Sequence, residues 1–248
     1  MSSHWFGGRP RAVGGRFRAV VGVVAAAVSA GSAVLTAAPS ASAQPCPDVE
    51  VVFARGTGEP PGVGGTGQAF VDGLRAQAGA RSVDVYPVAY EASSNFGGGI
   101  DFARTVVDGI RDAGSHIEST AANCPNTRIV LGGYSQGAAL AGYVTAAAIP
   151  DSVPEAFRSY IPQPMPPEVA NHVAAVVLFG EPSDEFMRDN GVPPVVIGPL
   201  YVPKTISLCA DGDTICNGAP SGAPSIAHAL YGMNGLTGQG AAFAARRL

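Results

Sequence analysis

Apolar runs rich in β-branched residues alternate along the chain with segments of helical spacing, and this alternation leaves few folds open. Strand-like runs cover residues 49–54, 83–89, 128–132, 174–179 and 205–208. Helical spacing covers residues 68–78, 100–119 and 136–148, and a last helix is expected within 226–248. The pattern predicts one α/β domain, a three-layer sandwich with a central, mostly parallel sheet between helices. The proline-rich residues 150–167 are expected to form a surface excursion.

The first 43 residues have the three-part pattern of a secretory signal. Four arginines between residues 9 and 18 precede an apolar stretch at 19–38, and Ala41-Ser42-Ala43 follows as an A-x-A cleavage site. A transmembrane anchor is the alternative, since about 20 apolar residues span a bilayer, but Gly, Ser and Thr dilute this stretch. We therefore expect a signal peptide at 1–43 and one domain at 44–248. The protein would be secreted, with no stable membrane span after cleavage and with retention at the cell envelope left open.

Composition and charge narrow the classes of partner. The 248 residues are 46% hydrophobic and 14% charged, which is too apolar for a disordered chain. Cleavage after Ala43 would remove four arginines and no acid, and so change the formal net charge from −4 to −8. An acidic surface of this kind disfavours nucleic acids and anionic membranes as partners.

All four cysteines lie after the expected cleavage point. An even count in an exported protein predicts two disulfides. Cys209 and Cys216 are seven residues apart around a Gly-Asp turn, so the simplest pairing joins them and leaves Cys46 for Cys124. A metal site is the rival interpretation, but neither C-x-x-C nor a histidine at ligand spacing is present, and we expect no metal.

The segment Arg128-Ile-Val-Leu-Gly-Gly-Tyr-Ser-Gln-Gly-Ala runs from a strand through G-x-S-x-G into a helix. This context is typical of a nucleophile elbow, in which a serine occupies a tight turn at the carboxyl end of a strand. Glycines are needed at 133 and 137 because side chains would clash as the chain doubles back. Ser135 would then be free to attack, with the N–H of Gln136 directed at a developing oxyanion. An ordinary glycine-rich turn with a solvated serine is the alternative.

A serine nucleophile needs a histidine as general base. In the hydrolase order of Ser, acid and His, the base follows the last strand, and among the four histidines only His228 does so. His4 leaves with the signal, whereas His116 and His172 are expected to be surface or core residues.

The base in turn needs a carboxylate that fixes its tautomer. This acid must lie at a strand end between the serine and the histidine, and the candidates are Glu181, Asp184, Asp211 and Asp213. Position favours Asp211 and Asp213, which directly follow the strand at 205–208, but it does not choose between them.

Four motifs in this order resemble the cutinase family, especially the exported cutinase-like esterases of actinobacteria. They are A-R-G-T-G-E at 54–59, G-Y-S-Q-G-A at 133–138, C-A-D-G-D-T-I-C at 209–216 and I-A-H-A-L-Y-G at 226–232. Family members carry the acid four residues after the first cysteine of the third motif. The resemblance therefore implies Ser135 as nucleophile, Asp213 as acid and His228 as base on an α/β-hydrolase fold. It also implies the disulfide pairing already favoured by spacing.

The first motif implies the second donor of an oxyanion hole. Fungal members have serine after A-R-G, where this chain has Thr57, so the hole would consist of the N–H groups of Thr57 and Gln136. The alternative is that Thr57 merely ends a strand.

The resemblance further implies hydrolysis of carboxylic esters by a monomer without a cofactor, on small-molecule, lipid or polyester substrates. Residues 193–203 and 95–97 are candidates for apolar walls beside the site, with surface packing as the alternative. Between Ser135 and His228, no long helical insertion has the pattern of an amphipathic lid. Two other functions stay open at this point. One is an acetylxylan-type carbohydrate deacetylase, and the other is a non-catalytic exported surface antigen.

Gly62, Gly64 and Gly67 form a G-x-G-x-x-G pattern between a strand and a helix, which is also typical of dinucleotide-binding turns. Six residues separate the pattern from the strand end at Arg55, where that fingerprint requires a tight turn, and Asp84 lies inside a strand. We therefore expect no nucleotide cofactor and interpret the glycines as a mobile loop near the oxyanion hole.

Overall fold

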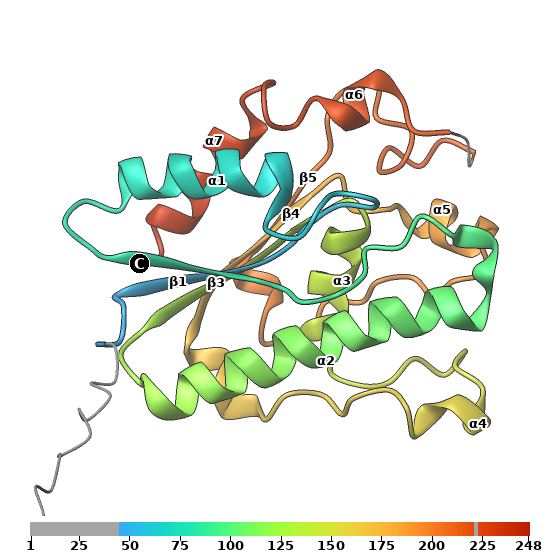
Figure 1. The fold of residues 1–248 in the computed structure, drawn as a ribbon, viewed down its shortest axis with the longest axis horizontal. Helices are drawn as coiled ribbons and strands as arrows, with labels where there is room; N and C mark the ends of the chain where they lie inside the picture. Colours follow the sequence, from blue (N-terminus) through green and yellow to red (C-terminus); the bar gives the residue numbers. More distant parts are fainter. Residues whose placement is uncertain (1–44, 221–222) are drawn as a thin grey trace, which may run out of the picture. The chain divides into compact units, whose positions relative to one another are not determined.

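The computed structural model describes residues 45–220 and 223–248, and within them a five-stranded sheet runs through the molecule (Figure 1). Its strand order is β2-β1-β3-β4-β5, and every neighbouring pair is parallel. The strands are β1 (Val49–Ala54), β2 (Val83–Pro87), β3 (Arg128–Tyr134), β4 (Val173–Phe179) and β5 (Thr205–Leu208). The predicted signal peptide at 1–43 lies outside the described residues and stays a prediction.

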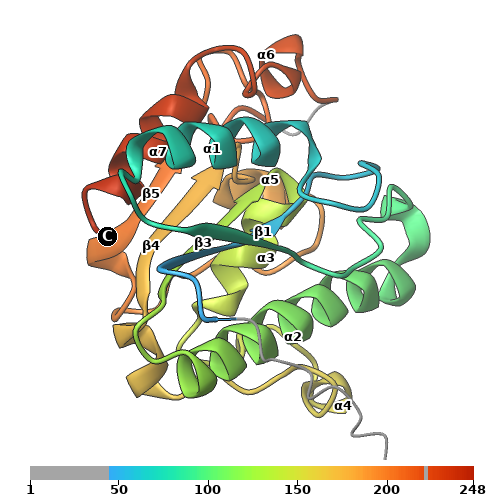
Figure 2. The ribbon, with the colours of Figure 1, turned by 60° about the vertical axis from the view of Figure 1, so that its left-hand side comes forward.

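Helices cover both faces of this sheet. The longer ones are α1 (Gly64–Gln77), α2 (Ile100–Asn123), α3 (Gln136–Val144) and α7 (Leu236–Ala245). The shorter ones are α4 (Glu155–Arg158), α5 (Asp184–Asp189), α6 (Ile226–Ala229) and the 3₁₀ helices η1 (Phe96–Gly98), η2 (Pro167–Asn171) and η3 (Val202–Lys204). In Figure 2, α1 and α7 lie on one face, and α2 and α3 lie on the other. The expected three-layer α/β architecture is therefore confirmed.

The strands divide the core into two layers because successive side chains point to opposite faces. On β1, Val51 and Phe53 face α1 and α7, whereas Val52 faces α2 and α3. Phe53 lies with its ring centroid 6.0 Å from that of Phe70 and 6.4 Å from that of Phe179. Burial on both sides explains why the segments of β1, β3 and β4 consist of nearly continuous apolar runs.

Element boundaries differ from the sequence expectations where side chains or backbone turns intervene. The strand expected at 83–89 ends at Pro87, since the N–H of Ala89 instead donates to the Asp112 carboxylate at 2.8 Å. The helix expected at 136–148 ends at Val144, where the Thr145 N–H turns back to Gly142 O. The helix expected at 100–119 runs on to Asn123. The last helix is divided into α6 and α7, and the proline-rich excursion contains the four-residue α4.

The strand order places two loops at the same edge of the sheet. After β1 the chain passes through α1 to β2, which lies on one side of β1 in the sheet. From β2 it passes through α2 to β3, which lies on the other side of β1, so the connections diverge between β1 and β3. In open α/β sheets, sites form at the carboxyl ends of strands beside such a switch point. The loop after β1 and the turn after β3 therefore meet where chemistry is expected.

Candidate active site

Ser135 lies in a strained turn between β3 and α3. Its backbone has φ 55° and ψ −120°, a conformation that L-residues rarely adopt and that costs about 1–3 kcal/mol. A Cβ at Gly133 would lie 2.0 Å from Gly137 O, and one at Gly137 would lie 2.1 Å from Ala54 O. Only glycine fits at either position. The sharp turn holds the serine at the carboxyl end of the sheet, as in a nucleophile elbow.

A chain of hydrogen bonds joins this serine to a histidine and an aspartate. Ser135 Oγ lies 2.8 Å from His228 Nε2, and His228 Nδ1 lies 2.8 Å from Asp213 Oδ2. A carboxylate can only accept, so Nδ1 donates to Asp213 and Nε2 of the neutral ring is left to accept the serine proton. His228 is 6% exposed and Asp213 is fully buried. The arrangement has the nucleophile, base and orienting acid in the order that proton abstraction from a serine requires.

The structure separates the four acids that the sequence proposed. Asp213 faces the histidine, whereas Asp211, two residues earlier, is exposed. Glu181 accepts a hydrogen bond from the Ser207 hydroxyl at 2.7 Å, and burial raises the pKa of its carboxyl. Asp184 lies in α5 in an ion pair with Arg188. Of the four, Asp213 is the one that His228 contacts.

Asp213 is held by groups that the sequence reasoning missed. Its Oδ1 accepts the N–H of Ile215 at 2.9 Å, and its Oδ2 accepts the hydroxyl of Tyr231 at 2.8 Å. The Tyr231 hydroxyl in turn accepts the N–H of Ala210 at 2.8 Å. Burial, together with the hydrogen bond to Asp213, raises the pKa of Tyr231, so its hydroxyl stays protonated as a donor. The signal was present in the I-A-H-A-L-Y-G motif, where Tyr231 follows His228 by three residues.

The histidine is supported on its other side by Tyr134, the residue before the serine. The Tyr134 hydroxyl donates to the backbone carbonyl of His228, and the two rings lie 5.2 Å apart. Burial raises the pKa of Tyr134 to about 12, so this hydroxyl is also a donor at neutral pH. Gly180, with φ 56°, completes the packing, since a Cβ there would lie 3.1 Å from His228 Cε1 and 3.2 Å from Asp213 Oδ2.

Both disulfides join the cysteines that the sequence analysis paired. Cys46 is bonded to Cys124, which ties the start of the described chain to the end of α2. Cys209 is bonded to Cys216, and this short ring contains Asp213. The two sulfurs and the Asp213 carboxylate lie close enough to be compared with a metal site, but sulfurs engaged in a disulfide are not thiolate ligands.

The loop after β1 lies against the serine turn. A Cβ at Gly56 would lie 2.6 Å from the Tyr134 ring, and Gly137 abuts the carbonyl oxygens of Ala54 and Arg55. Thr57 therefore sits in the loop beside the elbow, beyond the end of β1 at Ala54. As the first residue of α3, Gln136 has an N–H without an intrahelical acceptor. The positions of both residues fit the oxyanion hole that the resemblance implied.

The glycine-rich pattern is not the mobile loop that we expected. Gly64 and Gly67 lie in the first turn of α1, which begins four residues before the predicted start. The reason is Glu59, whose carboxylate accepts the N–H of Gly65 at 2.8 Å and so satisfies a donor at the helix N-terminus. An internal acid therefore occupies the end of α1 to which a nucleotide phosphate would otherwise bind.

The candidate walls of the acyl site have exposed apolar side chains. Phe96 is 60% exposed, and the neighbouring Ser93 carbonyl accepts the Gln136 side-chain amide at 3.1 Å, which ties this segment to the elbow. In the segment 193–203, Val196 is 68% exposed, whereas Tyr143 on α3 donates its hydroxyl to Pro193 O. Between Ser135 and His228, the described helices that precede α6 are nine residues or shorter.

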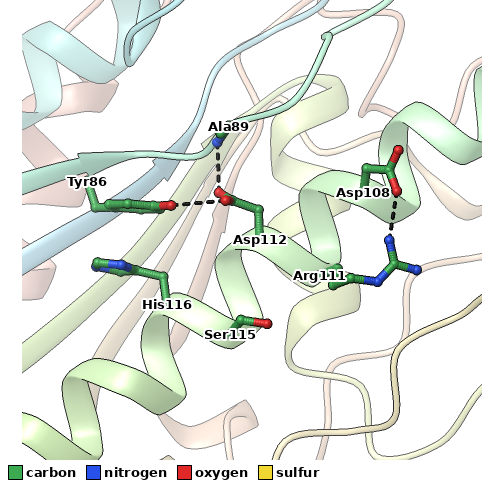
Figure 3. A pocket seen from close by; sticks show the side chains of 7 residues that line it. All are labelled: Tyr86, Ala89, Asp108, Arg111, Asp112, Ser115 and His116. Atoms are coloured by element: carbon green, nitrogen blue, oxygen red, sulfur yellow. Dashed lines mark hydrogen bonds and ion pairs between the residues drawn. The ribbon is translucent and has the colours of Figure 1, made fainter. Parts of the chain in front are cut away.

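A separate polar pocket lies between β2 and α2, with a volume of about 490 Å³ (Figure 3). In it, the rings of Tyr86 and His116 are stacked 3.4 Å apart, and the Tyr86 hydroxyl donates to Asp112. His116 also pairs with the Glu50 carboxylate at 3.1 Å. His116 is thus a structural residue, as expected. His172, another of the three described histidines, follows η2 as its C-cap, and its backbone carbonyl accepts the Ile129 N–H at 2.9 Å.

Comparison with known proteins agrees with this geometry. A family profile described as Cutinase matches residues 45–248. The probable carboxylesterase Culp7 of Mycobacterium tuberculosis is 60% identical over 173 residues, which cover 70% of this chain and 89% of that protein. The structure of Trichoderma reesei cutinase in complex with a C11Y4 phosphonate inhibitor has a TM-score of 0.56 at 31% identity, over 80% of this chain and 75% of that chain.

A second solved structure resembles this chain in its fold alone. The catalytic core domain of acetyl xylan esterase from Trichoderma reesei has a TM-score of 0.62 at 22% identity, over 82% of this chain and 100% of that chain. The fold is that of the α/β-hydrolases, and the protein is a carboxylic ester hydrolase. The chain belongs to the cutinase family. Within residues 45–220 and 223–248, no helix combines the length and the apolarity that crossing a bilayer requires.

Proposed function

We propose that the protein is a secreted serine esterase that forms an acyl-enzyme on Ser135. The hydroxyl oxygen attacks the ester carbonyl carbon while His228 Nε2 takes its proton. Asp213 stays ionised and holds the Nδ1–H of the imidazolium that forms. The tetrahedral intermediate collapses as His228 returns the proton to the leaving alcohol, and water then releases the acid by the same two steps. The observation that carries this proposal is the unbroken hydrogen-bond chain from Ser135 through His228 to Asp213.

We propose that the backbone N–H groups of Thr57 and Gln136 donate hydrogen bonds to the negatively charged oxygen of the tetrahedral intermediate. Two preorganised donors of this kind act without reorganising during the reaction, and removing one typically costs about 3 kcal/mol in the transition state. The Gln136 N–H lies at the start of α3, where the helix dipole also favours negative charge. No step of this mechanism calls on a cofactor or a metal.

We propose short- to medium-chain acyl esters, lipid esters or cutin-like polyesters as the substrates. The exposed apolar side chains of Phe96 and Ile226 support this proposal, since Ile226 is two residues from the base and 80% exposed. The short helices between Ser135 and the base support an open site that accepts dispersed esters.

Secretion is part of the proposal and is supported by the signal pattern at 1–43 and by the two disulfides. It is tested by expressing the full chain in an actinobacterial host and determining the N-terminus of the protein in the medium and in the cell envelope. A mature protein that begins at Gln44 is the expected result, and an uncleaved chain in the membrane fraction would contradict it.

The catalytic proposal is tested with p-nitrophenyl esters of graded chain length and with acetylated xylan, using wild-type protein and Ser135→Ala. We expect turnover of the p-nitrophenyl esters by the wild type only, with the variant keeping the wild-type melting temperature. Turnover by Ser135→Ala would exclude the acyl-enzyme on this serine. Preferential release of acetate from xylan would instead identify a carbohydrate deacetylase.

A further inference from the structure

The carboxylate of Glu59 links the loop after β1 to the first turn of α1. Its Oε2 accepts the N–H of Gly56 at 2.6 Å, and its Oε1 accepts the N–H of Gly65 at 2.8 Å. Helix α1 has no side-chain cap at Val63 and no acid in its first turn. A residue outside the helix therefore supplies the negative charge that a helix N-terminus favours.

Gly64, the first residue of α1, makes room for this carboxylate. Gly64 has φ 71°, and a Cβ there would lie 2.1 Å from Glu59 Oε2 and 2.4 Å from its Cδ. Any side chain at 64 would thus displace the carboxylate as well as strain the backbone. Of the three glycines in the G-x-G-x-x-G pattern, Gly64 makes room for the internal acid, whereas a Cβ at Gly67 would lie 2.7 Å from the Phe53 ring and one at Gly62 would meet nothing within 4 Å.

Glu59 also sets the direction of the Thr57 N–H. The backbone N–H of Glu59 donates to Gly56 O at 3.3 Å. The carbonyl of Gly56 and the N–H of Thr57 belong to one planar trans peptide, so they point in opposite directions. Fixing the carbonyl toward Glu59 directs the N–H of Thr57 away from it. Gly56 is thus held by Glu59 through both its N–H and its carbonyl.

Other hydrogen bonds hold the rest of the loop after β1 in place. The N–H of Gly58 donates to Ala92 O at 2.7 Å, and the Arg55 side chain donates to Glu59 O at 2.8 Å. Arg55 is 4% exposed and also donates to Tyr90 O. Because Gly56 packs against the Tyr134 ring, a shift of this loop changes the placement of Thr57 relative to the elbow.

We propose that Glu59 is the positioning residue of the oxyanion loop, and that its carboxylate, seated on the glycine-rich start of α1, preorganises the Thr57 N–H for the tetrahedral intermediate. The inference rests on the proposed function, which places Thr57 in the oxyanion hole. Glu59 does not touch the substrate in this proposal, so its loss affects the transition state more than the binding of the ester.

The first test is Glu59→Gln, which puts an amide NH₂ against one of the two glycine N–H groups. We expect kcat to fall about 10- to 100-fold with KM within about 2-fold of the wild type. The second-order rate of inactivation by a p-nitrophenyl phosphonate, which forms a tetrahedral adduct, should fall in parallel. The shape of the pH profile should stay the same, because the base is untouched. Glu91→Gln, at an exposed acid, is the matched control and should keep the wild-type kcat.

The second test is a pair of glycine variants that strain the backbone equally. Gly64 and Gly79 have φ 71° and 68°, but a Cβ at Gly79 meets nothing within 4 Å, whereas one at Gly64 meets the Glu59 carboxylate. Both alanine variants should melt at lower temperature. Only Gly64→Ala should lose kcat per folded molecule, by the same factor as Glu59→Gln.

The outcomes separate this inference from the catalytic proposal. Wild-type kcat per folded molecule in Glu59→Gln would overturn the inference while Ser135→Ala remained inactive. If Glu59→Gln does not fold, equal kcat per folded molecule in the two glycine variants would overturn it. Turnover by Ser135→Ala would instead refute the catalytic proposal on which it rests.

Discussion

The hydroxyl of Tyr231 is the buried group whose removal gives the sharpest test of how the acid is held. Tyr231 is fully buried, and its hydroxyl donates to Asp213 Oδ2 at 2.8 Å and accepts the N–H of Ala210 at 2.8 Å. Tyr231→Phe removes both hydrogen bonds and leaves the ring in place among its neighbours, Tyr134 and Phe179.

The expected loss of stability follows from these two bonds. A hydrogen bond to a charged group contributes about 1.5–3 kcal/mol, and leaving a buried donor unsatisfied costs about 1–3 kcal/mol. The Ala210 residue is 7% exposed, so water replaces the lost acceptor only in part. We expect the free energy of unfolding to fall by about 3 kcal/mol in Tyr231→Phe. In a domain of this size each kcal/mol shifts Tm by about 2–4 °C, so Tm should fall by about 6–12 °C.

Activity should respond less than stability. Asp213 keeps the Ile215 N–H on Oδ1 and His228 on Oδ2, so the imidazole retains its orientation. We expect kcat on p-nitrophenyl butyrate to fall by less than about 10-fold, because the acid, base and nucleophile remain in contact.

The control is Tyr201→Phe, at a tyrosine that is 5% exposed and whose hydroxyl makes no hydrogen bond within the described residues. Its loss should change the free energy of unfolding by no more than about 0.5 kcal/mol. Thermal and urea unfolding of both variants, with hydrolysis measured on the same samples, decide the matter. If the Tm of Tyr231→Phe lay within about 1 °C of the Tm of Tyr201→Phe, the two variants would differ in stability by only about 0.3 kcal/mol. This result would refute the reasoning.

Asp213→Asn should lower kcat by about 10⁴-fold, because the histidine tautomer is no longer fixed, whereas Asp211→Asn should keep a kcat near that of the wild type. Hydrolysis assays check both variants, and similar losses of kcat in the two would contradict the assignment of Asp213 as the acid. Replacing Cys209 and Cys216 together by Ser should lower the free energy of unfolding by about 2 kcal/mol, as measured by thermal melts. The loss of kcat in the hydrolysis assay should be proportionally larger than this loss of stability, because the ring holds Asp213. Despite burial, hydrogen bonds hold the pKa of Glu50 below its ordinary value of 4.5. Its contribution to stability is therefore present above pH 4.5 and lost as pH falls through the lowered pKa. Urea unfolding at several pH values should show the stability gap to Glu50→Gln closing in acid.

Much of the fold and the nucleophile could be predicted because the signals are local. The strand, turn and helix around Ser135 lie within one continuous segment, and its two glycines meet neighbours at the same turn or at the end of β1. The strands at 49–54 and 205–208 have the predicted bounds, and for the first of them the reason is that a buried parallel strand leaves an apolar run. Helix ends were predicted less well, because they depend on contacts such as that of Glu59 with the start of α1.

The acid and its support depended on tertiary structure. Asp211 and Asp213 have the same sequence context, and residue pattern alone left the choice open until the family resemblance favoured Asp213. The two differ in the folded chain because the Cys209–Cys216 ring turns Asp213 inward, toward a histidine 15 residues away, and leaves Asp211 exposed.

The sequence by itself determined the layered α/β architecture, the turn that carries Ser135, and the family to which the chain belongs. The architecture and the turn depend on hydrophobic periodicity and on steric limits within a few residues, whereas the family followed from the resemblance of four motifs in order. The tertiary structure decided which carboxylate meets His228, that Tyr231 holds that carboxylate, and that the glycine-rich pattern receives Glu59. These features depend on hydrogen bonds whose partners, 3 to 18 residues apart, face each other only in the folded chain.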